Sequence, residues 1–154
     1  MASAGEQAYC PWEDLAARTH LAFAITRLPL ADGWYLHDVP GIVIDDRLDR
    51  VQRRCVLAHE LAHIDLGHLH QVAGNGPGTA RLARRNEAAA DDLASRRLMP
   101  LDALLRALPF APCDAEAAEL LDVTEHLLAV RLSRLCPAER RQIARVVRSV
   151  PAAA

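Results

Sequence analysis

The sequence predicts an α+β fold, in which a small antiparallel three-stranded sheet packs on a pair of long helices and a set of short helices follows. Three observations support this prediction. Over positions 20–44, short apolar stretches typical of strands are separated by turn residues. Two long segments with helical periodicity follow, and prolines divide the rest of the chain into short helical segments. With 154 residues, 51% of them hydrophobic and 25% charged, the chain has the size and composition of one globular domain.

The N-terminal part of the chain predicts a tail, a short helix and three strands. Residues 1–11 are small and polar and end at a proline, which is typical of a flexible tail, and residues 12–19 have a helical composition. Apolar residues alternate with smaller or polar ones over 21–25, which is the period of a half-buried strand. Turn residues separate this strand from two more, at 34–37 and 42–44, so we expect an antiparallel meander.

Two long helices and four short ones are predicted after the sheet. Apolar residues recur at helical spacing over 51–66 and stop before Gly67, so we expect this helix to be mostly buried. A second helix runs from about 80 to 99 and is halted by Pro100. The glycine-rich segment 74–78 separates the two and is expected to be the most flexible stretch. The short helices are predicted at 101–108, 114–121, 124–135 and 138–147.

An HExxH sequence lies inside the first long helix, at residues 59–63. Four residues advance a helix by slightly more than one turn, so His59 and His63 stand on one face and can bind one metal ion. Glu60 lies about 100° further round, where its carboxylate can take a proton from bound water. The alternative is a pair of partly exposed histidines with Glu60 in a surface ion pair. Apolar neighbours argue against it, because buried polar groups without partners are costly.

A third metal ligand is not found directly after this motif. The longer zinc motif that ends in a third histidine is excluded, because it would need a glycine and a histidine where the chain has Leu66 and Leu69. His68 lies about 180° round the helix from the first motif histidine and faces away unless the chain turns at Gly67. His70 returns to the same side but lies about 16 Å along the axis if the helix continues. We expect both histidines at the surface.

A better candidate lies on the second long helix, where residues 86–91 read NExxxD. Glu87 and Asp91 share one face of that helix. Two histidines and one glutamate leave one position of a zinc ion open for water, which is the catalytic rather than the closed structural arrangement. Asp91 is then free to accept a hydrogen bond from the outer nitrogen of a ligating histidine. The alternative for Glu87 is a solvated carboxylate that pairs with Arg84.

These motifs resemble those of the ImmA/IrrE family of metallopeptidases. The resemblance rests on HELAH at 59–63 and on RRNEAAADDLASRRLMP at 84–100, with strands before and small helices after, and it covers about 12–135. Two positions depart from the family pattern: Leu93, where phenylalanine is usual, and Arg97, where an apolar residue is common. Neither is a proposed ligand, so the departures concern local packing.

The resemblance implies a chemistry and a substrate. It implies a zincin-like core with a gluzincin-like zinc site, in which His59, His63 and Glu87 bind Zn²⁺ and Glu60 is the general base. Family members are associated with cleavage of helix-turn-helix repressors in phage, mobile-element or stress-response circuits, which implies a zinc metallo-endopeptidase with a protein substrate of that kind. The candidates for stabilising the oxyanion are Tyr35, His68, His70 and His126.

The predicted organisation is a flexible tail over 1–11, a zincin-like metallopeptidase core over 12–108, and a helical extension over 109–154 that packs on the core. No apolar run approaches the roughly 20 residues that span a bilayer, and no basic start precedes an apolar segment at the N-terminus. The four cysteines are scattered and form no CxxC pair. We therefore expect a cytoplasmic protein without a membrane segment, in which Cys55 is a buried small residue rather than a redox-sensitive ligand.

A competing hypothesis comes from the charge distribution. The chain carries a net charge of −2, but residues 131–154 carry +5, and all 18 basic residues of the protein are arginines. Residues 122–125, followed by an amphipathic helix, resemble the second half of a helix-turn-helix. The alternative is thus a non-catalytic zinc-containing regulatory protein that binds DNA or a repressor through basic C-terminal helices. For the basic C-terminal helices, a solvated surface is favoured over a binding surface. Glu60 favours an enzyme over a regulatory protein, because a structural metal site has no use for a base.

Overall fold

The predicted elements are all present in the computed structural model, which describes residues 8–36, 39–68 and 77–149. The flexibility predicted for the N-terminal tail and for the glycine-rich segment concerns residues that lie largely outside this described part. In chain order the elements are α1 (Pro11–Ala17), β1 (Ala22–Thr26), β2 (Gly33–Leu36), β3 (Gly41–Asp45), α2 (Arg50–Asp65), α3 (Pro77–Leu98), α4 (Leu101–Ala107), η1 (Leu108–Phe110), α5 (Asp114–Leu121), α6 (Glu125–Ser133) and α7 (Pro137–Ser149).

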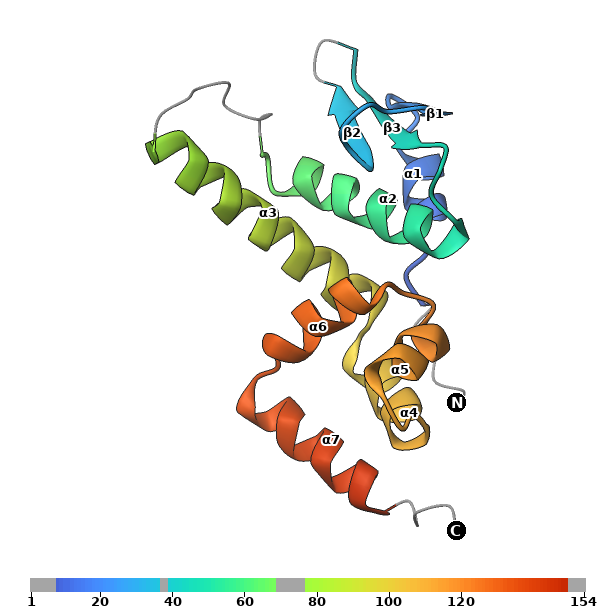
Figure 1. The fold of residues 1–154 in the computed structure, drawn as a ribbon, viewed down its shortest axis with the longest axis vertical. Helices are drawn as coiled ribbons and strands as arrows, with labels where there is room; N and C mark the ends of the chain where they lie inside the picture. Colours follow the sequence, from blue (N-terminus) through green and yellow to red (C-terminus); the bar gives the residue numbers. More distant parts are fainter. Residues whose placement is uncertain (1–7, 37–38, 69–76, 150–154) are drawn as a thin grey trace, which may run out of the picture.

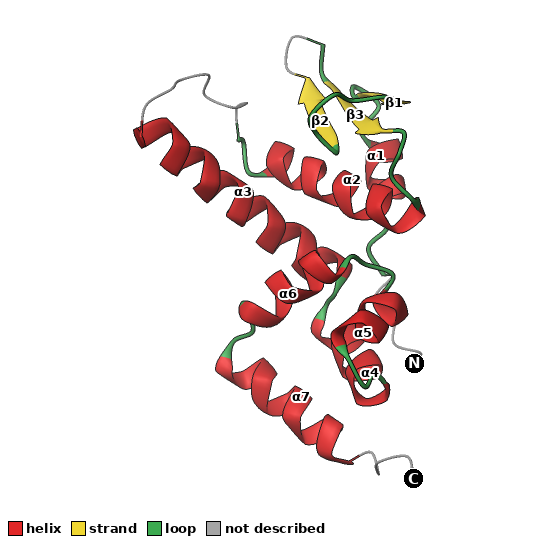
Figure 2. Ribbon diagram, viewed as in Figure 1, coloured by secondary structure: helices red, strands yellow, loops and turns green. Residues whose placement is uncertain are grey.

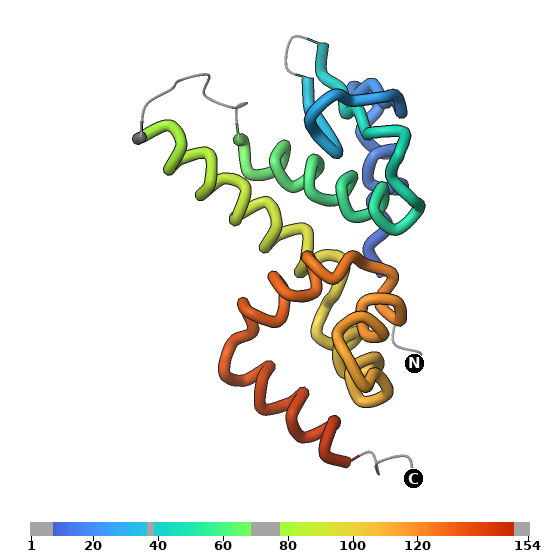
Figure 3. Tube along the Cα trace, viewed as in Figure 1, coloured from blue at the N-terminus to red at the C-terminus, as the bar shows by residue number. Residues whose placement is uncertain are grey.

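The α+β class that the sequence predicts is confirmed. The sheet covers one side of α2, α3 crosses the other side, and α4 to α7 gather beyond the C-terminal end of α3 (Figure 1, Figure 2). α3 contacts both α2 and α6, and Figure 3 traces it from the C-terminal end of α2 to the short helices. One long helix therefore connects the sheet and α2 with the C-terminal helices.

The strand order differs from the predicted antiparallel meander. β3 lies in the centre and pairs antiparallel with β2, as predicted, but parallel with β1. β3 takes the central place because its Ile42 and Ile44 are fully buried against α2, whereas all residues of β1 are exposed. The expectation of a half-buried first strand is therefore also wrong. β1 and β2 form the two edges of the sheet.

Helix α2 is buried between two apolar clusters. Leu57 and Leu61 pack with Ile42 and Ile44 under the sheet. On its other side α2 meets α3 through small, fully buried side chains, so the two helices approach closely. We call this contact the alanine seam; it consists of Ala58, Ala62, Ala90 and Ala94.

Local sequence defines both ends of α2. At the start, the Asp49 carboxylate accepts a hydrogen bond from the Gln52 N–H, and the Gln52 side chain accepts one from the Asp49 N–H, which makes a capping box. At the other end Leu66 is the C-cap and Gly67 has a φ of 63°, in the left-handed region that favours glycine. The next residue, His68, donates its backbone N–H to the His63 carbonyl at 3.0 Å.

A buried ion pair attaches α7 to the rest of the protein. The Arg131 side chain of α6 is 3% exposed, and it donates to the Met99 carbonyl at 3.0 Å and to Glu139 of α7 at 2.6 Å. The second Glu139 oxygen accepts the backbone N–H of Cys136 at 2.8 Å. No residue of α7 is itself fully buried, although Ile143 packs against the main apolar cluster, so this carboxylate adds a polar link to that packing.

The predicted division into tail, core and extension stays a prediction. Within the described ranges, no helix is both long enough and apolar enough to cross a membrane.

The Glu139 carboxyl should make the attachment of α7 sensitive to acid. Its hydrogen bond with Arg131, aided by the Cys136 N–H, lowers its pKa to about 2. A lowered pKa stabilises the folded state above the unfolded pKa of about 4.3, and this stabilisation is lost as the pH falls through about 2. We expect Glu139→Gln to lower the melting temperature at pH 7 and to have little effect near pH 2. Equal effects at both pH values would contradict this.

Candidate metal centre

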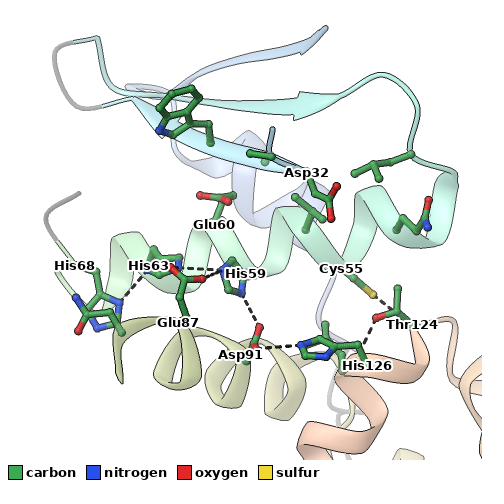
Figure 4. Close-up of a pocket in the computed structure, with 18 of the residues that line it drawn as sticks. Asp32, Cys55, His59, Glu60, His63, His68, Glu87, Asp91, Thr124 and His126 are labelled. Carbon is green, nitrogen blue, oxygen red and sulfur yellow. Dashed lines mark hydrogen bonds and ion pairs between the residues drawn. The ribbon is translucent and has the colours of Figure 1, made fainter. Parts of the chain in front are cut away.

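Helices α2 and α3 bring three of the predicted site residues together. The Nε2 atoms of His59 and His63 lie 2.9 Å apart, and Glu87 oxygens lie 3.2 Å from the first and 3.5 Å from the second (Figure 4). One donor atom from each residue lies within 4.8 Å of the others. The alanine seam explains this proximity, because it holds the two helix backbones close beside the three side chains.

The chemistry of this donor set fits a divalent cation such as zinc. Ligands at tetrahedral positions around zinc, with bonds of about 2.0–2.1 Å, lie about 3.3 Å from one another. The two Nε2 atoms lie 2.9 Å apart, and each of them lies 3.2 or 3.5 Å from a different Glu87 oxygen, so small adjustments of these side chains bring one donor atom from each residue to such positions. Two imidazole nitrogens that face each other at such a distance also need a proton or a cation between them, because their lone pairs otherwise repel.

Asp91 lies where the sequence places it, behind the first histidine. The His59 Nδ1–H donates a hydrogen bond to Asp91 at 2.8 Å, which leaves the Nε2 atom of His59 to bind a metal ion. The other Asp91 oxygen accepts a hydrogen bond from the His126 Nε2–H of α6 at 3.1 Å. One carboxylate therefore connects the candidate ligand to a 70% exposed imidazole on a third helix.

Electrostatics at the site favour a positive charge. Burial opposes protonation of His59, but hydrogen bonds to Asp91 and Glu87 outweigh it and raise the pKa of His59 to about 10. The hydrogen bonds from His59 and His63 hold the pKa of the Glu87 carboxyl well below its usual range. Without a cation, a proton therefore occupies this position, and a metal ion that binds there must displace it.

Glu60 occupies a different environment from Glu87. Its side chain lies on the side of α2 that faces β2 (Figure 4), and the residue is 8% exposed. Burial raises its pKa, although the neighbouring His59 and His63 and a backbone hydrogen bond from Tyr35 oppose the shift. Gly33 of β2 makes room for this carboxylate: a Cβ there would lie 3.0 Å from Glu60 Oε1 and only 2.4 Å from Val56 Cγ1.

The candidate residues line an open cleft of about 670 Å³ between β2, α2, α3 and α6. Apolar side chains such as Trp34 and Leu82 line it together with the polar residues. Cys55 also borders the cleft, but the residue is 4% exposed and its sulfur accepts the backbone N–H of Thr124 at 3.4 Å (Figure 4). The cysteine thus contacts the α6 N-terminus, in keeping with the small buried residue that we expect.

One histidine lies at a different place from the one that the sequence predicts. His68, expected to face away at the surface, lines the cleft, and its Nδ1 lies 3.0 Å from Nδ1 of His63. The expectation fails because the chain leaves the helix before His68 instead of continuing it. The signal in the sequence is Gly67, a typical residue just beyond a helix end. Of the other oxyanion candidates, His126 lines the cleft and His70 lies outside the described residues.

The two departures from the family pattern, Leu93 and Arg97, lie outside the donor set. Leu93 packs against the main apolar cluster, and Arg97 pairs with Asp65 at 2.7 Å, which links α3 to the end of α2. Asp65 also accepts hydrogen bonds from Arg18, next to α1. The arginine therefore takes part in an ion-pair network away from the donor atoms.

A helix pair that carries two histidines and a carboxylate beside an open cleft is an arrangement typical of hydrolytic metal sites. The comparison with known protein families agrees with a hydrolytic site of this kind. Residues 18–133 match the model of a peptidase family described as the IrrE N-terminal-like domain, so the chain belongs to this family, and the resemblance to ImmA/IrrE peptidases is confirmed. A search among curated proteins found no match.

The close fit of Gly33 against α2 can be tested by substitution. Gly33→Ala forces Val56 and Glu60 to shift, so we expect its free energy of unfolding in urea to fall by about 1–3 kcal/mol. Gly78→Ala is the matched control, because nothing lies within 4 Å of its added Cβ and alanine favours the helix by up to about 1 kcal/mol. A Gly33→Ala protein as stable as the wild type would contradict the close fit.

Proposed function

We propose that the protein is a zinc-dependent endopeptidase, with His59, His63 and Glu87 as ligands of Zn²⁺ and Glu60 as the general base. The convergence of two imidazole nitrogens and a carboxylate oxygen within 4.8 Å of one another carries this proposal. Such a ligand set leaves a coordination position open, which supports a catalytic rather than a structural site. Membership in a peptidase family supports peptide hydrolysis.

The chain's own residues supply the proton transfers. A zinc ion held here would provide a Lewis acid that polarises the scissile carbonyl and makes water more acidic. Glu60 takes a proton from the water whose oxygen attacks the carbonyl carbon, and it passes that proton to the amine when the C–N bond breaks. Its raised pKa suits the first step, because a more basic carboxylate accepts a proton more readily. Asp91 is a positioning residue that orients His59.

The proposed substrate is a helix-turn-helix repressor of a phage, mobile-element or stress-response circuit, and the proposed location is the cytoplasm, where such repressors act. The position of β2 supports a protein substrate. It is an edge strand, and its Gly33 and Trp34 line the cleft, so an extended peptide segment can pair with its open side.

The alternative of a DNA-binding or repressor-binding protein rests on α7. Arg141 and Arg145, one turn apart, line a shallow cavity of about 370 Å³ on this exposed helix. The preceding helix gives the alternative less support. In α6, Leu127 and Leu128 are buried and Arg131 is paired with Glu139, so the arginine of this helix is not available to contact DNA.

The ligand set predicts the metal content of three variants. Purified wild-type protein should bind one zinc ion per chain. His59→Ala and Glu87→Ala should each weaken zinc binding more than about 100-fold, because even an outer partner of a ligand contributes about 10–100-fold. Elemental analysis and chelator competition measure this, with Glu119→Ala, an exposed carboxylate on α5, as the control. Full zinc content in Glu87→Ala would show that the third ligand is another residue.

The role of Glu60 predicts the outcome of a cleavage assay. Zinc-loaded protein is incubated with a repressor encoded beside its gene, and cleavage is followed by gel electrophoresis and mass spectrometry. Glu60→Gln keeps the size of the side chain but removes the base, so we expect it to bind zinc normally and to cleave about 10²–10⁴-fold more slowly. Equal cleavage by the two proteins, or none by either at normal zinc content, would rule out the catalytic assignment.

A further inference from the structure

Each candidate histidine ligand has a partner at its outer nitrogen, but the two partners differ in kind. His59 has the carboxylate of Asp91 at 2.8 Å, and His63 has the imidazole of His68 at 3.0 Å. The His68 ring is half-buried and borders the cleft (Figure 4). The backbone of His68 also donates to the carbonyl of His63, so the two residues are joined at two points.

The end of α2 explains this contact from the sequence upward. The His68 N–H bonds to the His63 carbonyl, and the Gly67 N–H bonds to the Ile64 carbonyl, both at 3.0 Å. These two bonds around a left-handed glycine define a Schellman motif. The motif brings the second residue after the C-cap against the residue three positions inside the helix end, a contact that is usually apolar. Here both positions hold histidine.

The tautomers of the two histidines determine which ring donates the hydrogen bond between His63 and His68. A histidine that binds a cation through Nε2 carries its proton on Nδ1, where it must be donated to an acceptor. The structure places the His68 Nδ1 at hydrogen-bond distance from the His63 Nδ1, and it can accept only when the His68 proton is on Nε2. The two rings therefore fix each other's tautomers.

We propose that His68 is a positioning residue that holds His63 in the orientation and tautomer required for metal binding. This proposal rests on the proposed metal centre and deepens it. His68 then does for the second ligand what Asp91 does for the first, but as a neutral acceptor. The metal centre thus gains one anion, not two, from the partners of its histidines, and less of the cation's charge is compensated.

The test compares zinc affinities of the full chain by competition with a chelator. His68→Phe keeps a ring but removes the acceptor, and we expect the Kd for zinc to rise about 10–100-fold. His68→Asn keeps an acceptor close to the Nδ1 position, and we expect most of the affinity to return. His20→Ala, an exposed histidine outside the cleft, is the control for loss of any imidazole. Circular dichroism melting of the zinc-free proteins checks that each variant is folded.

The outcomes separate this proposal from the proposed function. A His68→Phe protein that is folded and binds zinc as tightly as the wild type would overturn the role of His68 and leave the metal centre intact. A wild-type protein that binds no zinc would overturn the metal centre and the role of His68 together. Nitrogen-15 NMR of the zinc-loaded wild type gives an independent check: the proposal requires the Nε2–H tautomer of His68, and the Nδ1–H tautomer would overturn it.

Discussion

The geometry of the candidate site depends on the contact between α2 and α3. The two histidines lie on one helix, and Glu87 and Asp91 lie on the other, so the separation of the helix axes sets every distance between them. The alanine seam fixes that separation, because its side chains are the smallest that can fill a buried helix contact. None of the four alanines belongs to the donor set, yet a larger side chain at any of them would move a histidine away from a carboxylate.

Two glutamates in the same cleft have opposite electrostatic environments. Glu87 is 54% exposed at its side chain and lies against two histidines, which lower its pKa, whereas Glu60 is buried beside the sheet, which raises its pKa. A permanently ionised carboxylate suits cation binding, and a more basic one suits proton transfer. The fold therefore gives identical side chains different basicities through their surroundings, and the sheet contributes by covering Glu60.

Features governed by local sequence could be predicted, and features governed by distant contacts could not. The helices, the strands and the donors His59, His63 and Glu87 follow from periodicity, prolines and motif spacing. The parallel pairing of β1 with β3 joins segments separated by a whole strand, and no turn signal encodes it. The link from Asp91 to His126 is likewise set by how α6 packs on α3. His68 was within reach of prediction, because Gly67 precedes it.

The helix end at Gly67 makes the contact of His63 depend on the number of residues between this histidine and the glycine. A surface turn usually tolerates the loss or gain of a residue, but here the count between the second motif histidine and the glycine decides which side chain meets that histidine. One inserted residue would turn a different side chain onto His63, although every candidate ligand would remain in the sequence. Among related chains, a conserved HExxH motif therefore need not mean a conserved partner for the second motif histidine, and the spacing to the next glycine distinguishes the two cases.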